Sequence, residues 1–145
     1  MTTPFLRTAM AALACTAALA IVAPAHAEMK QMKAQLSGSN EVPPNDSKAS
    51  GSVDVTYDTA SKKVSWKGTY QNLSGPAVAA HFHAGEAGKN GGVAVPIFSG
   101  ASAKSPFSGS ATLTNAQARD LMAGHWYVNV HTAAHKAGEI RGQVK

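Results

Sequence analysis

Apolar and polar residues alternate along two neighbouring segments of the chain, residues 51–57 and residues 64–70. A period of two is typical of β-strands that bury one face. The six residues between the segments, 58–63, are polar enough to form a turn. The pattern therefore predicts a β-hairpin.

Six further short segments are bounded by Gly, Pro, Asn or Ser and have the length of strands. They are residues 31–36, 78–83, 93–98, 107–113, 126–131 and 140–144. About eight short strands in one domain are typical of an all-β antiparallel sandwich or barrel. Residues 41–45, with two prolines, and the glycine-rich residues 85–92 are predicted to be surface loops.

One short helix is predicted near residues 114–123. Thr114 and Gln117 have the spacing of a capping box, in which each side chain bonds to the backbone N–H of the other residue. Leu121 and Met122 supply apolar positions, and Gly124 provides a stop.

The first 27 residues have the organisation of a cleavable export signal. One cation, Arg7, precedes an apolar run over residues 9–23, and residues 25–27 (AHA) have the small-x-small form that signal peptidase accepts. A transmembrane anchor is the competing interpretation, but the run ends at Pro24 and lacks a cationic flank. We expect removal of residues 1–27 and folding of residues 28–145 as one domain in the periplasm or outside the cell.

Cys15, the only cysteine, lies within this signal. Lipid attachment there is a further alternative, but Leu13 is one place away from its usual position. The mature domain then has no disulfide, despite an oxidising destination. The chain has 13 Lys and Arg against 8 Asp and Glu, a net charge of +5. These cations are scattered, so neither nucleic-acid binding nor a membrane span after cleavage is predicted, whereas a homodimer through edge strands is compatible with the pattern.

Histidine is the residue type that points to a chemistry, because five of the six follow residue 80. Strand alternation places His81 and His83 on one face, with roots about 7 Å apart. That span lets both reach one metal ion through bonds of about 2 Å. A His-x-His pair alone is more often a polar surface pair, but His131, at the end of a strand, and His135, in the loop beyond, can complete a site. His125 lies roughly 20 Å from His131 along the same strand, which excludes a shared ion.

Imidazole ligands suit copper or zinc and disfavour calcium and magnesium, which bind oxygen. Copper is favoured by the affinity order, as Cu(II) or Cu(I), with zinc as the alternative. Met29, Met32 and Met122 are soft donors for Cu(I). A frayed terminus is the simpler interpretation of residues 29–32.

No nucleophile, thiol or close pair of acids in the mature segment has a recognisable catalytic arrangement. Glu139 and Arg141 lie on one strand face and are expected to form an ion pair or cross-strand contacts. Tyr127 and Asn129 share a face with His131 and are candidates to orient its ring. The opposite face of this strand is expected to lie in the core, and its residues are Trp126, Val128 and Val130.

Several motifs occur in an order and spacing that resemble the CHRD domain, named after chordin. They are residues 36–44 (LSGSNEVPP), 79–85 (AAHFHAG), 90–93 (NGGV) and 126–142 (WYVNVHTAAHKAGEIRG). The resemblance runs from about Met32 to Val144. It implies an all-β, Greek-key-like domain of immunoglobulin-like or barrel-like form, which in bacteria occurs as short exported proteins without an established enzyme activity.

The resemblance also implies that the usual histidines of the family match His81, His83, His131 and His135, whereas arginine is more usual at His125. Copper–zinc superoxide dismutase likewise holds copper with a His-x-His pair, but its bridging histidine, zinc-site aspartate and disulfide have no clear counterparts here.

These observations predict an exported protein that binds copper at His81, His83, His131 and His135 and serves in periplasmic copper buffering, storage or delivery. One alternative is a module that binds another exported protein and needs no metal. A dismutase-like copper enzyme is the third.

Overall fold

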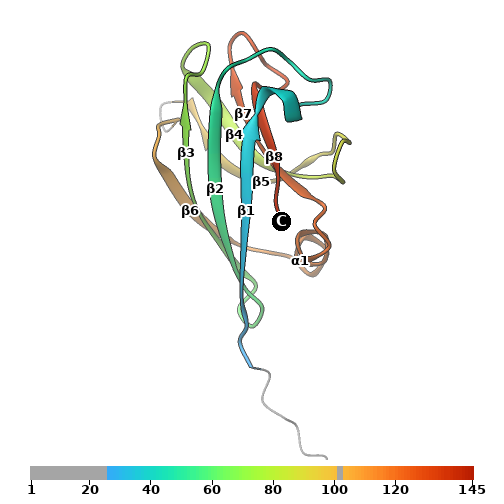
Figure 1. The fold of residues 1–145 in the computed structure, drawn as a ribbon. Coiled ribbons are helices and arrows are strands. Elements are labelled where there is room, and N and C mark those ends of the chain that lie inside the picture. Colours follow the sequence, from blue (N-terminus) through green and yellow to red (C-terminus); the bar gives the residue numbers. More distant parts are fainter. Residues whose placement is uncertain (1–25, 101–102) are drawn as a thin grey trace, which may run out of the picture.

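The computed structural model describes residues 26–100 and 103–145, and this part of the chain folds into eight strands and two short helices (Figure 1). The elements are β1 (Met29–Ser37), the 3-10 helix η1 (Gly38–Asn40), β2 (Ser50–Asp58), β3 (Lys63–Gln71), β4 (Ala77–Ala84), β5 (Val93–Ser99), β6 (Phe107–Thr112), α1 (Asn115–Met122), β7 (Trp126–Thr132) and β8 (Ile140–Gln143). The predicted strands and helix are all present, which confirms the all-β class. The predicted signal, residues 1–27, lies outside the described residues except for His26 and Ala27.

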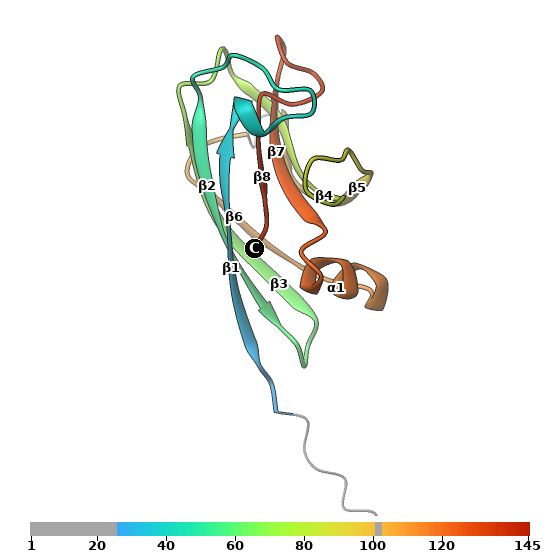
Figure 2. The same ribbon diagram turned by 45° about the vertical axis from the view of Figure 1, so that its right-hand side comes forward.

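The strands form one antiparallel sheet in the order β5-β4-β7-β8-β1-β2-β3-β6. Neighbours that are distant in sequence, such as β4 and β7, give the Greek-key-like connectivity. Figures 1 and 2 show the sheet curling round on itself. The end strands approach each other through Phe98 on β5 and Phe107 on β6, whose ring centroids are 5.2 Å apart. The fold is therefore a nearly closed, barrel-like sheet.

Alternate residues of each strand fill the interior. Val53 and Val55 on β2 and Val64 on β3 are fully buried, as the hairpin pattern predicts. Phe82 on β4 contacts Trp66 and Trp126 at ring-centroid distances of 5.2 and 5.4 Å. Burial of each such side chain contributes about 1.5–3 kcal/mol. The inward position of Phe82 fixes its neighbours, residues 81 and 83, on the outside.

The helix α1 begins at the predicted capping box. The Thr114 hydroxyl accepts a hydrogen bond from the Gln117 backbone N–H, and the Gln117 carbonyl oxygen accepts one from the Thr114 N–H. Leu121 is buried, and Gly124 at φ +74° ends the helix. Figure 2 shows α1 at one end of the sheet, next to the start of β7. No helix in the described part of the chain is both long and apolar enough to cross a bilayer.

A second buried layer covers the outer face of β7 and β8. The carboxylate of Glu139 accepts hydrogen bonds from the hydroxyls of Ser47, Ser74 and Thr132 and from the Ser74 N–H, all between 2.7 and 2.8 Å. Glu139 is fully buried. Within the described residues, Glu139 forms no ion pair with Arg141. Of the two contacts expected for Glu139, only the cross-strand one is present, and it is made with Thr132 on β7.

Arg141 instead fastens the loop of residues 85–92. Its guanidinium donates to the Asn90 side-chain oxygen at 2.9 Å and to the Lys89 carbonyl oxygen at 2.6 Å. The Asn90 amide in turn donates to the Val42 carbonyl oxygen. The two loops predicted at the surface are therefore tied to each other and to β8.

The prediction of a frayed segment at residues 29–32 was wrong. β1 begins at Met29, and its backbone pairs with β2 from Met29 opposite Asp58 onward. Lys30 also lies beside the carboxylate of Glu28.

Candidate metal centre

Three histidines from two neighbouring strands meet on the outer face of the sheet. His81 and His83 project from β4, and His131 projects from β7. His81 lies opposite Asn129 in the register, so His131, two residues further along β7, is its diagonal neighbour. Diagonal neighbours across an antiparallel pair lie within reach of long side chains. The pairing of β4 with β7 thus joins residues that are 50 positions apart in the chain.

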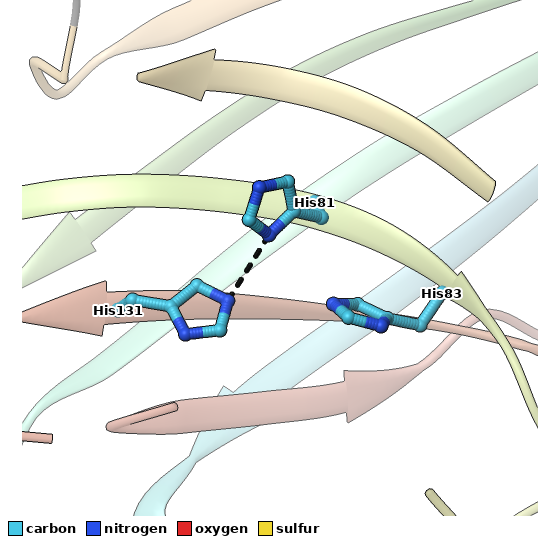
Figure 3. A group of neighbouring side chains, drawn as sticks. All are labelled: His81, His83 and His131. Carbon is cyan, nitrogen blue, oxygen red and sulfur yellow. Dashed lines mark hydrogen bonds between the residues drawn. The ribbon is translucent and has the colours of Figure 1, made fainter. Parts of the chain in front are cut away.

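The three imidazoles offer nitrogen atoms that all lie within 4.8 Å of one another. His81 Nδ1 is 3.1 Å from His131 Nε2, and the His83 ring faces this pair (Figure 3). Nitrogens bound to one tetrahedral ion through bonds of about 2 Å lie about 3.3 Å apart. One distance already has this length, so side-chain adjustments of an ångström or so would bring all three nitrogens to one ion.

Backbone carbonyls set the tautomers of two of these rings. His83 Nδ1 is 2.9 Å from the Gly91 carbonyl oxygen, and His131 Nδ1 is 2.9 Å from that of Lys136. A carbonyl oxygen only accepts, so each Nδ1 carries a hydrogen and each Nε2 of the neutral ring has a free lone pair. Such contacts to the far nitrogen are typical of metal-binding histidines.

The atoms that would bind a metal differ in their present partners. His83 Nε2 is buried and has no hydrogen-bond partner among the described residues. His131 Nε2 accepts a hydrogen bond from His81 Nδ1, because its lone pair cannot donate. A metal ion would replace that hydrogen bond once the His81 hydrogen has moved from Nδ1 to Nε2, and it would satisfy the buried nitrogen of His83.

The surroundings of His81 and His131 favour the neutral form of their rings. Burial lowers the pKa of His81, and the neighbouring His131 and His83 lower it further. Burial also lowers the pKa of His131, against the hydrogen bond to Lys136, which raises it. Because neutral imidazole is the form that binds metals, the lowered pKa values of His81 and His131 favour entry of an ion.

A comparison with protein-family models matches the CHRD domain over residues 32–144. The chain belongs to the CHRD domain family. Comparisons with curated proteins and with solved structures found no match. The match confirms the resemblance carried by the motifs of the sequence and indicates an extracytoplasmic module. The matched region contains every strand of this CHRD domain except the first residues of β1.

The CHRD domain does not bring His135, the fourth histidine expected at the site, into the group. β7 ends at Thr132, and the chain turns back through hydrogen bonds between the backbones of Thr132 and His135. This turn presents the Lys136 carbonyl to His131. His125 likewise lies elsewhere, in a small hollow that it shares with Glu86 and Asp120.

Tyr127 has a different role from the one expected. Its ring stacks on His83, with 4.9 Å between centroids and 6° between planes, and the Arg141 guanidinium carbon lies 3.5 Å from its centroid. Its hydroxyl accepts from the Gly91 N–H. Tyr127 therefore positions His83, whereas the Lys136 carbonyl orients His131. Asn129, the other expected partner of His131, donates to the Ala137 carbonyl oxygen instead.

The methionines of the CHRD domain are spread over its surface and core. Met29 and Met122 are 57% and 46% exposed, and Met32 packs partly against the core. Among the described His, Cys, Asp and Glu residues, imidazoles alone make up the candidate site.

Proposed function

We propose that this CHRD protein is exported to the periplasm after removal of residues 1–27 and binds one copper ion through His81, His83 and His131. The observation that carries the proposal is that the Nε2 atoms of His83 and His131 each have a lone pair, because their Nδ1 atoms hold the ring hydrogens. Two backbone carbonyls hold the Nδ1 hydrogens of His83 and His131, and the buried Nε2 of His83 has no hydrogen-bond partner in the described part of the chain. An unsatisfied buried acceptor costs about 1–3 kcal/mol, which a bound ion would recover.

Copper is the favoured ion because three neutral nitrogen donors match its preferences, and it binds nitrogen sites more tightly than the other divalent metals of its row. Three imidazoles leave at least one coordination position open. A site of this kind exchanges its ion with other carriers, which suits copper buffering, storage or delivery. The oxidation state is Cu(II) or Cu(I), and zinc is the competing ion.

Copper titration of the exported protein tests this proposal. The wild type should bind one equivalent, and the His81→Ala/His83→Ala variant should lose that site. His125→Ala is the matched control, because it removes an imidazole outside the group. His135→Ala should also bind as the wild type does.

Unchanged binding by the double variant would disprove the assignment. Thermal unfolding separates the proposal from a metal-free interaction module. A ligand that binds only the native state, at 100 times its Kd, stabilises it by about 2.7 kcal/mol. Copper should therefore raise the melting temperature of the wild type and of His125→Ala, but not that of the double variant.

A further inference from the structure

A cavity lies on the outer face of β1 and β8, beneath the loop of residues 85–92. Its volume is about 390 Å³. Three of its lining residues carry positive charge, namely Lys33, Arg141 and Lys145. Among the residues that the structure describes, no Asp or Glu lines it.

The strand pairing forces two of these charges together. The backbones of Lys33 and Lys145 exchange hydrogen bonds of 2.8 and 3.1 Å, so the two residues lie directly opposite each other. Like charges in directly opposed positions repel. Asp54 lies 3.4 Å from the Lys33 ammonium group, but both side chains are more than half exposed, so this ion pair contributes little.

Arg141 is a buried cation that forms no ion pair with a carboxylate of residues 26–100 or 103–145. Its side chain is 2% exposed, and the groups that accept from it are the neutral oxygens of Asn90 and Lys89. The carboxyl group whose charge acts on Arg141 is that of Glu41. Burial raises the pKa of Glu41 to about 7, so this carboxyl is only partly ionised at neutral pH. The carboxylate of Glu139 is already engaged by four hydrogen bonds. A buried charge without a counter-charge is costly, which favours an anion at this position.

We propose that this cavity is a binding site for a small multivalent oxyanion, a carboxylate or a phosphate. Arg141 supplies planar N–H donors at the buried wall, and Lys33 and Lys145 supply ammonium groups at the exposed side. Asn40 also lines the cavity, and one of its two amide hydrogens is engaged by the Gln35 carbonyl oxygen, whereas both amide hydrogens of Gln143 already go to backbone carbonyls. The cavity shares no residue with the three histidines.

Titration of the metal-free protein with inorganic phosphate and with citrate, followed by amide NMR spectra, tests the proposal. Saturable shifts should occur at Gly88, Lys33 and Lys145, and the tighter of the two probes shows whether phosphate or carboxylate is preferred. The Lys33→Gln/Lys145→Gln variant retains the buried Arg141 and should weaken binding at least fivefold. Lys63→Gln/Lys67→Gln is the matched control, since it removes two exposed charges from β3 and should bind as the wild type does.

Absence of saturable binding of both probes would overturn the proposal, as would equal weakening in the two lysine pairs, which would indicate a general effect of net charge. The His81→Ala/His83→Ala variant should bind the preferred probe with wild-type affinity. Loss of anion binding in that variant would contradict the separation of the two sites.

Discussion

Protonation of Glu139 should account for a large part of the acid sensitivity of this domain. Burial alone would raise its pKa, but hydrogen bonds from Thr132, Ser47 and Ser74 outweigh burial and lower the pKa from 4.5 to about 2. A pKa that is lower in the folded state stabilises the fold above the unfolded value, and this contribution is lost as the pH falls through the folded value. This lowering of the pKa corresponds to about 3 kcal/mol of stability at pH 7.

The pH course of this contribution follows from the same two pKa values. About 1 kcal/mol should remain at pH 3, and less than about 1 kcal/mol at pH 2. Glu139→Gln preserves the shape of the side chain and removes the charge, so its deficit in unfolding free energy should shrink by about 2 kcal/mol between pH 7 and pH 3. Urea denaturation of both proteins at pH 7, 5, 4 and 3 measures this difference.

Titration of the other groups cancels in the difference between the two proteins, because the substitution leaves those groups in place. Asp54→Asn is a suitable control, since it makes the same chemical change at an exposed position. A deficit for Glu139→Gln that varies by less than about 0.5 kcal/mol over this range would refute the linkage argument.

Three further predictions concern the loops and the histidines. Tyr127→Leu should weaken copper binding about tenfold, because the ring stacked on His83 is lost. Tyr127→Phe keeps the ring, so its copper affinity should stay within about threefold of the wild type, and a competition assay with a copper chelator compares the two variants. Gly138→Ala should lower the unfolding free energy by about 1–3 kcal/mol in urea denaturation, since φ is +133° and a Cβ would lie 2.5 Å from Glu41 Oε1. Because the pKa values of His81 and His131 are lowered, protonation of these two rings should weaken copper binding only at a lower pH than it would for an ordinary imidazole. Calorimetry of copper binding to the wild type at several pH values measures this, and a fall at or above about pH 6.5 that can be traced to these two rings would contradict it.

The strands and the helix could be predicted because their signals are local. Alternation marks one buried face of a strand without knowledge of its partner, and the capping box of Thr114 and Gln117 lies within four residues. The same alternation placed His81 and His83 together outside the core, opposite Phe82. The short segment of residues 29–32 could not be predicted to be ordered in this way, because its order comes from pairing with β2.

The composition of the histidine group depends on a pairing that no local pattern specifies. His131 reaches His81 only because β7 lies beside β4, and the backbone turn after Thr132 directs the Lys136 carbonyl, and not the His135 ring, toward the group. The burial of Glu139 and Arg141 could not be predicted from the sequence either, because charged residues on one strand face are usually exposed.

The carbonyl of Gly91 connects the loop of residues 85–92 to the chemistry of the histidines. It accepts from His83 Nδ1 at 2.9 Å and lies 3.3 Å from the Tyr127 hydroxyl. Opening of the loop would remove the acceptor that fixes the tautomer of His83. Closure of the loop should therefore raise the affinity for an ion, and a bound ion should favour closure of the loop by the same free energy. Amide hydrogen exchange at Gly91 should therefore slow when the histidines bind an ion, with the same free energy that closure of the loop adds to binding.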